Sequence, residues 1–205
     1  MDLTIVEHPL AAHYLTRLRN KETNPEQFRA AARRLTYLLL VEATRESSTM
    51  EIEVETPLET TKGYKIGDLV AVAVLRAGLG LLDAVVDLVP HVKVGYAGVA
   101  RNEDTAMPEE YYVKFPEMAG AQVLILEPML ATGGSLSWAC DKAKEAGATN
   151  ITALCVVAAP AGLERMQQDH PDVRIVAAAK DRDLSDRYYI QPGLGDMGDR
   201  LFGTL

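Results

Sequence analysis

Cysteine is scarce in this chain, and the spacings typical of metal ligands are missing. Cys140 and Cys155 are the only cysteines, they form no CxxC pair, and Cys155 lies inside an apolar run that predicts a buried thiol. This pattern excludes a disulfide framework and favours a reducing compartment, which we expect to be the cytoplasm. The four histidines are scattered, so we interpret them as surface or structural residues and not as metal ligands.

Long apolar runs and an excess of basic charge are also missing. No segment approaches the roughly 20 apolar residues of a membrane span, and the N-terminal stretch lacks the basic region and apolar core of a signal peptide. With 21 basic against 29 acidic residues, the formal net charge is −8, which opposes a broad nucleic-acid-binding surface. A local anion site is still allowed, because a Debye length of about 8 Å limits the influence of distant charges.

The chain does contain a regular alternation of apolar strands and helices. Its 205 residues, 48% of them hydrophobic, suit one compact domain. Alternating strands and helices predict an α/β fold with a mostly parallel sheet flanked by helices. The expected strands are 69–75, 92–100, 123–126, 151–157 and 173–178, and the expected helices are 79–88, 136–146 and 160–170.

The N-terminal third is less regular. We expect residues 1–24 to form an irregular arm, followed by a helix that begins at Pro25, is capped by Asn24 and runs to about Glu42. Its wide apolar face fits either contact with a partner subunit or a deep position in the chain's own core. Residues 47–67 mix polar and β-branched side chains, and within them Ile52 and Val54 alternate with glutamates at 51, 53 and 55, which predicts a short one-sided strand or a hairpin.

The stretch from Val123 to Ser135 carries the most information about function. An apolar strand, a small-residue loop and a helix start are expected to form an anion site, because loop N–H groups and a helix dipole of about half a positive charge point at the same place. Thr132 and Ser135 add hydroxyl donors, while Glu127 suits the hydroxyls of a sugar or a bridging metal. The pattern indicates a phosphorylated sugar; an ordinary βα turn with a glycine-rich N-cap is the alternative.

Two arginines follow the first two strands of the predicted sheet. Arg76 ends an apolar strand, which predicts pairing with an anion such as a diphosphate or, alternatively, with a core-edge carboxylate such as Asp83. Arg101 begins a polar loop over residues 101–105 that is either functional or a solvated turn. Since ligands of parallel sheets sit beyond the carboxyl ends of the strands, Arg76, Arg101 and Glu127 are expected to converge.

The C-terminal stretch 189–204 is rich in glycine. Residues 193–198 satisfy GxGxxG, but too few residues follow to build the helix and strand of a dinucleotide site. We expect these glycines to let the backbone curl against a ligand; a glycine-rich surface turn is the alternative. The preceding cluster Asp181-Arg182-Asp183 is expected to be solvated.

Three stretches together resemble the uracil phosphoribosyltransferase family: residues 127–135, residues 74–80 with 101–105, and residues 189–204. The resemblance runs from His8-Pro9-Leu10 to the last residues. It implies a phosphoribosyltransferase-like fold over 1–205, with an N-terminal helical arm at about 1–46, a core at about 68–180, a base-binding tail at about 181–205 and a small hood formed by the tail and a β-arm.

The resemblance also implies a reaction, in which the phosphoribosyl group of 5-phosphoribosyl 1-diphosphate (PRPP) passes to uracil, giving UMP and diphosphate. It implies Mg²⁺ held mainly by PRPP, a homodimer or larger homo-oligomer, and a GTP effector. From the charge balance and the short apolar runs we expect neither a nucleic acid nor a membrane as partner. Catalytic roles fall to Arg101, Glu127 and Asp196. The implied PRPP ligands are Arg76, Arg101, Glu127, Pro128, Met129, Leu130, Ala131, Thr132, Gly133, Gly134, Ser135 and Asp196, and the implied uracil ligands are Ile190, Gly195, Asp196 and Met197.

The chain departs from the family's usual pattern at Glu127, Met197 and Ala73, where Asp, Ala and Pro are usual, and over residues 180–185. The longer Glu127 side chain shifts a carboxylate where geometry is strict. These departures motivate a second hypothesis, a sensor that binds UMP or PRPP without turnover. A third, an RNA-binding regulator, is opposed by the acidic balance.

Overall fold

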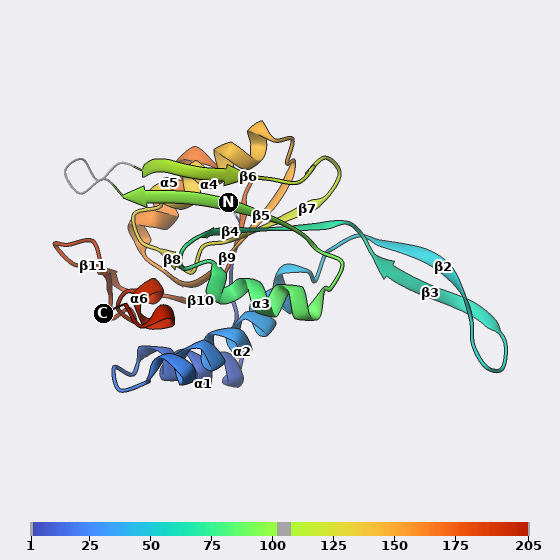
Figure 1. Ribbon diagram of the computed structural model, residues 1–205, viewed down its shortest axis with the longest axis horizontal. Helices are drawn as coiled ribbons and strands as arrows, with labels where there is room; N and C mark the ends of the chain where they lie inside the picture. The colour runs from blue at the N-terminus through green and yellow to red at the C-terminus, as the bar shows by residue number, and fades with distance from the viewer. Residues whose placement is uncertain (1, 102–107, 205) are drawn as a thin grey trace.

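The computed structural model describes residues 2–101 and 108–204, and a twisted central sheet forms its core (Figure 1). The strands of this sheet are β1 (Leu3–Ile5), β4 (Leu69–Leu75), β5 (Lys93–Arg101), β6 (Pro108–Lys114), β7 (Gln122–Leu126), β8 (Met129–Leu130), β9 (Asn150–Ala158) and β10 (Arg174–Lys180). Their order is β1-β10-β9-β7-β4-β5-β6, with β8 beside β9. Every pairing is parallel except that of β5 with β6. The predicted fold class is therefore confirmed.

Helices cover both faces of the sheet. They are α1 (Pro9–Arg19), α2 (Pro25–Ala43), α3 (Leu79–Leu88), α4 (Gly134–Glu145), α5 (Pro160–Asp169) and α6 (Met197–Phe202). In Figure 1, α4 and α5 lie above the sheet, and α1, α2 and α3 lie below it. Among the described residues, none of the helices combines the length and apolar character needed to cross a membrane.

The central strand β4 shows why the sheet is buried on both faces. Its odd-numbered residues from Leu69 to Ala73 join the hydrophobic cluster that includes α1, α2 and α3. Its even-numbered residues from Val70 to Val74 join the second cluster, beneath α4 and α5. Because successive side chains of a strand point to opposite faces, a continuous apolar run is what such a position requires.

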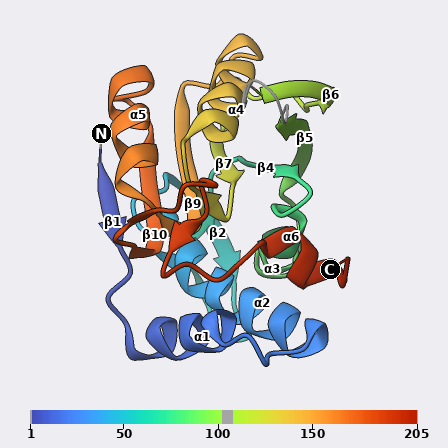
Figure 2. The same ribbon diagram turned by 90° about the vertical axis from the view of Figure 1, so that its left-hand side faces the viewer.

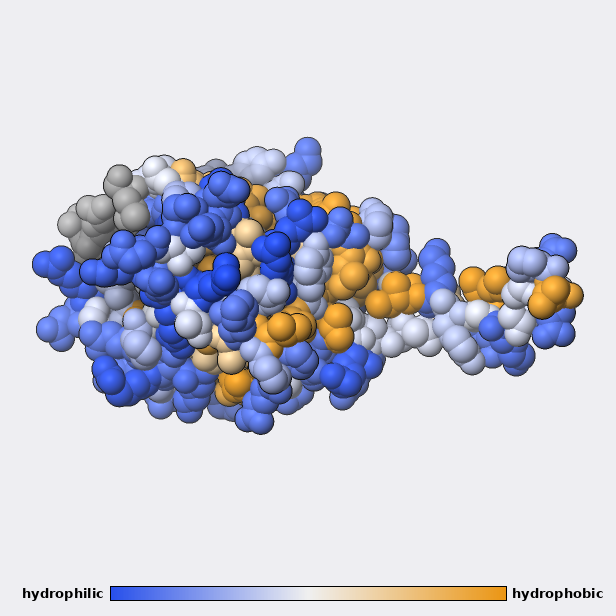
Figure 3. Space-filling model, turned by 90° about the horizontal axis from the view of Figure 1, so that it is seen from below, coloured by the Kyte–Doolittle hydropathy of each residue, from blue (hydrophilic) through white to orange (hydrophobic). Residues whose placement is uncertain are grey.

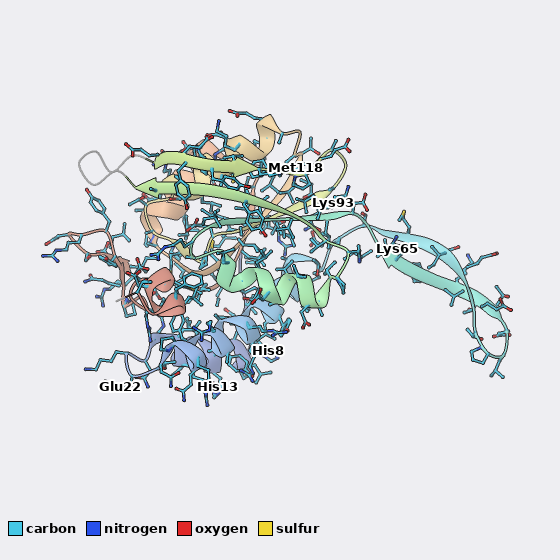
Figure 4. All side chains as sticks on the ribbon, in the orientation of Figure 1. His8, His13, Glu22, Lys65, Lys93 and Met118 are labelled. Atoms are coloured by element: carbon cyan, nitrogen blue, oxygen red, sulfur yellow. The ribbon has the colours of Figure 1, made fainter. Side chains whose placement is uncertain are left out.

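The helix predicted from Pro25 is confirmed as α2, and the Asn24 side chain accepts a hydrogen bond from the Gln27 N–H at 2.9 Å. Leu35, Leu39 and Leu40 of this helix are fully buried within the chain's own core. The predicted hairpin is also confirmed: β2 (Thr49–Glu55) pairs antiparallel with β3 (Thr60–Ile66). It projects from the body as an arm, with Lys65 near its base (Figures 1 and 4).

The expectation of an irregular arm over residues 1–24 is wrong. Leu3–Ile5 adds a parallel strand beside β10, and Pro9–Arg19 forms α1. His8 caps α1 by accepting a hydrogen bond from the Leu10 N–H, and it lies with His13 on the outer helical layer (Figure 4). The buried residues Ala11, Leu15 and Leu18 recur at helical spacing.

Candidate active site at the carboxyl edge of the sheet

The predicted site residues lie along one edge of the sheet, which faces the viewer in Figure 2. Strands β4 and β7 are neighbours in parallel register, with Ala73 opposite Leu126. Arg76 directly follows β4 and Glu127 directly follows β7, so both emerge at the same edge. Arg101 ends β5, on the other side of β4. Its side chain and residues 102–105 of the predicted loop lie outside the described residues.

The first half of the 127–135 loop is tied to strand β9. The Glu127 N–H donates to the Leu154 carbonyl at 3.2 Å. The Pro128 carbonyl accepts from the N–H groups of Val156 and Val157, and the Leu130 carbonyl accepts from the Ala159 N–H at 2.8 Å. This backbone pairing fixes the chain up to Leu130 and leaves the small residues after it outside the strand pairing.

The second half of the loop is the start of α4. Gly133 occupies the N-cap position with φ of +82°, a left-handed conformation that glycine adopts without a steric penalty. Among the described residues, no side chain caps this helix. The N–H groups of the first helical turn lack partners within any α-helix. Here they combine with the Thr132 and Ser135 hydroxyls to make a site suited to a phosphate.

Glu127 carries an unusual carboxyl group. Burial raises its pKa to about 8. Within residues 2–101 and 108–204, no side chain or backbone group donates a hydrogen bond to this carboxyl. A carboxyl group placed at a ligand-facing edge without donors of its own is available to accept hydrogen bonds from the hydroxyls of a bound sugar.

Arg76 meets an anion of the chain itself, but this partner is not Asp83. Its Nη2 lies 2.9 Å from Oδ1 of Asp199 in α6, and its Nη1 is 3.4 Å from the Thr204 hydroxyl. The hydrogen bond from Thr204 and then that from Arg76 hold the pKa of the Asp199 carboxyl below its ordinary value. Since exposed pairs of this kind contribute only about 0–1 kcal/mol, an incoming diphosphate can compete for the guanidinium.

The tail is held in place by the helices that precede it in the chain. Asp181 is 6% exposed; it binds the Arg19 guanidinium and accepts the Gly193 N–H at 2.9 Å. The expectation that Asp181 is solvated is therefore wrong. The Arg200 guanidinium donates to the carbonyls of Leu18, Asn20 and Leu194 and lies 4.3 Å from the Phe28 ring centroid.

The predicted uracil-binding residues form a short curl between β12 (Ile190–Gln191), the partner of β11 (Asp183–Leu184), and α6. Ile190 and Met197 are buried, whereas Gly195 and Asp196 are exposed. The Met197 side chain belongs to the hydrophobic core, and the whole residue is 1% exposed. Asp196 caps α6 by accepting the Asp199 N–H at 2.9 Å.

The tail and the Arg76 turn are in direct contact. A Cβ on Gly198 would lie 3.3 Å from Oδ1 of Asp196 and 3.6 Å from Nη2 of Arg76. The side chains of Asp196 and Arg76, both predicted site residues, therefore lie close together beside Gly198. The turn at residues 76–78, here called the Arg76 turn, packs closely against the end of β7, because a Cβ on Gly78 would lie 2.4 Å from the Leu126 carbonyl oxygen. The structure thus brings Arg76, Glu127, the loop and the tail to one edge. The sequence analysis did not predict a role for Asp199. The signal available for it was an acidic side chain within the glycine-rich tail, directly after Gly198.

Comparisons with known proteins cover nearly the whole chain. The sequence profile of the family described as "Uracil phosphoribosyltransferase" matches residues 5–204. The uracil phosphoribosyltransferase of Fervidobacterium nodosum is 47% identical, over 98% of this chain and 99% of its own. The AQ2163 protein of Aquifex aeolicus superposes with a TM-score of 0.94 at 36% identity, covering 98% of this chain and 97% of that one. A phosphoribosyltransferase from Corynebacterium diphtheriae shares the fold alone, with a TM-score of 0.53 at 14% identity, covering 92% of this chain and all of that one.

Proposed function

The chain belongs to the uracil phosphoribosyltransferase family, and we infer from this membership that it transfers the phosphoribosyl group of PRPP to uracil, giving UMP and diphosphate. The observation that carries this function is the meeting, at one edge of the sheet, of a helix N-terminus suited to phosphate and a backbone curl suited to a base. A sugar phosphate bound at the helix N-terminus and a pyrimidine bound at the curl would lie side by side, so that a bond can form between the ribose and the base.

The 5′-phosphate of PRPP is assigned to the N–H groups and hydroxyls of residues 132–135. Glu127 accepts hydrogen bonds from the ribose hydroxyls, and Arg76 and Arg101 bind the diphosphate. Binding energy gained at the 5′-phosphate, away from the reacting carbon, is used to orient the ribose for attack. Pro128 to Leu130 hold this arrangement through their pairing with β9, and the Ala131 N–H donates to the Met129 carbonyl.

Uracil is assigned to the curl at Ile190, Gly195, Asp196 and Met197, where backbone N–H and C=O groups can match the ring's donors and acceptors. A ring nitrogen attacks the anomeric carbon while the bond to diphosphate breaks, through an oxocarbenium-like state. Negative charge gathers on the leaving diphosphate, and the arginines stabilise it. Asp196 is the nearest carboxylate to the base and the candidate acceptor of its proton, although it also caps α6.

Mg²⁺ is proposed as the cofactor. Among the described residues, no group of three or more histidine, cysteine or acidic side chains could hold a metal ion. An ion whose ligands come mainly from the oxygens of PRPP needs no such group, and Glu127 is able to supply one carboxylate oxygen to it. When bound, Mg²⁺ neutralises part of the charge that develops on the diphosphate.

The first prediction is turnover itself. Purified protein with uracil, PRPP and Mg²⁺ should produce UMP and diphosphate in equal amounts, which chromatography of labelled uracil and a diphosphate assay can measure. Removing Mg²⁺ with a chelator should abolish the rate. Tight binding of PRPP or UMP with no UMP formed from uracil or any other pyrimidine base would contradict the transferase and support a sensor.

A GTP effector is the second part of this proposal. A pocket of about 530 Å³ lies between α2, α3 and α6, and three arginines line it, Arg29, Arg33 and Arg34, together with Tyr37. Its volume suits a nucleotide, and its guanidinium groups suit phosphates. Arg33 is also bound by Tyr37 and Asp87, whereas the Arg34 guanidinium donates, among the residues that the structure describes, only to the Ala30 carbonyl of its own helix.

We expect GTP to raise the rate of UMP formation by the native protein and to have little effect on the Arg34→Ala variant, because that variant loses a phosphate ligand without losing a tertiary contact. Initial rates across a GTP titration measure both. A native rate that GTP leaves unchanged, or an equal response in the variant, would contradict the assignment.

Assembly and location complete the proposal. The β2–β3 arm exposes Met50, Ile52, Val54 and Leu58, and Figure 3 shows hydrophobic residues along it and on the body beside its base. A two-stranded hairpin alone is marginally stable in water, so an arm of this kind is best stabilised by a second copy of the chain. This supports a homodimer or a larger homo-oligomer. The buried thiols of Cys140 and Cys155 support a reducing, cytoplasmic location.

A further inference from the structure

The phosphate loop carries no basic side chain of its own, since residues 127–135 read Glu-Pro-Met-Leu-Ala-Thr-Gly-Gly-Ser. A helix N-terminus supplies only about half a positive charge, whereas a phosphate monoester carries close to two negative charges near neutral pH. A cation brought from elsewhere in the fold would therefore strengthen the site. Helix α5 is the element that packs against the loop.

The contact between α5 and the loop is close. A Cβ on Gly162, in the first turn of α5, would lie 2.7 Å from the Ala131 carbonyl oxygen. One turn later, the Arg165 side chain crosses the loop: a Cβ on Gly133 would lie 3.2 Å from Cβ of Arg165, and a Cβ on Gly134 would lie 3.4 Å from its Nη1. The guanidinium therefore reaches the backbone at the beginning of α4.

The Arg165 side chain is held in this position at one end only. Its Nε donates to Oδ2 of Asp169 at 3.1 Å, and the Ser137 hydroxyl of α4 donates to the same oxygen at 3.0 Å. These hydrogen bonds, Ser137 first, hold the pKa of the Asp169 carboxyl below its ordinary value. Within the described parts of the chain, neither Nη group of Arg165 has a hydrogen-bond partner. The side chain is 42% exposed, so these donors are open to a ligand.

We propose that Arg165 is a further substrate-binding residue, which donates from its Nη groups to the 5′-phosphate of PRPP and of UMP. This inference rests on the proposed function, because it takes the loop as the 5′-phosphate site. The Asp169–Ser137 contact acts as the positioning element that aims the guanidinium. A pre-aimed guanidinium loses less side-chain entropy on binding than a free one.

The test compares Arg165→Gln and Arg165→Lys with the native protein. A hydrogen bond to a charged group typically contributes enough for about a tenfold change in affinity, so Arg165→Gln should raise the KM for PRPP and the inhibition constant of UMP roughly tenfold. The KM for uracil and the inhibition constant of diphosphate should stay unchanged, because neither carries the 5′-phosphate. Arg165→Lys should restore much of the loss, since it keeps the charge.

The matched control is Arg45→Ala. Arg45 pairs with Glu42, which lies near Arg174 at the start of β10, and hence at the opposite edge of the sheet. This variant should leave all four constants unchanged. Equal constants for native protein and Arg165→Gln would overturn the inference, and so would a parallel rise for uracil and diphosphate, which would indicate a structural role.

Ribose 5-phosphate separates this inference from the proposed function. Calorimetry with this compound needs no turnover, and the native protein should bind it about ten times more tightly than Arg165→Gln does. A protein that makes no UMP but shows this difference would contradict the transferase and retain the phosphate-binding role of Arg165. Equal binding, or no binding to the native protein, would overturn that role even if UMP is formed.

Discussion

Glu127→Gln is expected to lower kcat/KM for PRPP by roughly 100-fold, because the amide puts an NH2 donor in place of one of the two oxygens that accept hydrogen bonds from the ribose hydroxyls, in a site where geometry is strict. The fold should persist, since Glu127 lies at a loop mouth and among the described residues no donor binds its carboxyl. Steady-state kinetics and thermal unfolding measure the two effects separately. The matched control is Glu127→Asp, which introduces the family's usual residue and should retain activity within about tenfold of the native value.

The pH dependence of unfolding gives the same variant a second readout. The folded-state pKa of Glu127 is about 8, against an ordinary value of 4.5, so the folded state binds more protons than the unfolded state between these two pH values. The free energy of unfolding contributed by this group must therefore fall as pH rises from about 4.5 to 8. In Glu127→Gln this fall should disappear, leaving the variant more stable than the native protein at pH 8. A large drop in melting temperature with activity unchanged would reverse the assignment of Glu127 to the site.

Gly78→Ala is expected to destabilise the protein by about 3 kcal/mol and to remove most of its activity. The added Cβ would lie 2.4 Å from the Leu126 carbonyl oxygen and 2.6 Å from the N and O atoms of Val74, and none of these backbone atoms can move away cheaply. The Arg76 turn must separate from β7, which breaks the alignment of Arg76 with Glu127. With an unfolding entropy of about 2.1 cal/mol/K per residue, the melting temperature should fall by about 7 °C.

Gly147→Ala is the control for this substitution. Gly147 also resists a side chain, because its φ is +92°, but a Cβ there would meet nothing within 4 Å. The cost should be only the left-handed penalty of about 1–2 kcal/mol, with full activity retained. Similar melting temperatures and similar activities for the two variants would show that the packing of Gly78 on β7 does not hold the site together.

The sequence predicts most of the sheet because its strands are apolar on both faces. The run from Leu69 to Leu75 admits few other readings, and the glycine-rich turn at Gly133 follows directly from its own residues. Local signals of this kind depend on burial and on backbone conformation, and both are encoded within a few residues. Arg76 and Glu127 were found for the same reason, as polar residues at the ends of apolar strands.

The remainder depends on contacts between distant parts of the chain. Strand β1 is too short and too mixed to be recognised until β10 supplies its hydrogen-bond partners. Asp181 reads as a solvated acid in the sequence, and only the fold brings Arg19 and the Gly193 N–H to it. The Arg76–Asp199 pair likewise joins residues more than a hundred positions apart, which no local pattern can indicate.

A crystal structure with UMP is the most direct test of the central claim, that the loop at residues 132–135 and the curl at residues 190–197 bind the two ends of one nucleotide. The account predicts the 5′-phosphate of UMP within hydrogen-bond distance of the Gly133–Ser135 N–H groups and the uracil ring against the backbone of Gly195, Asp196 and Met197. Density for UMP at any other place, or a phosphate at the loop with the base turned away from the curl, would contradict it.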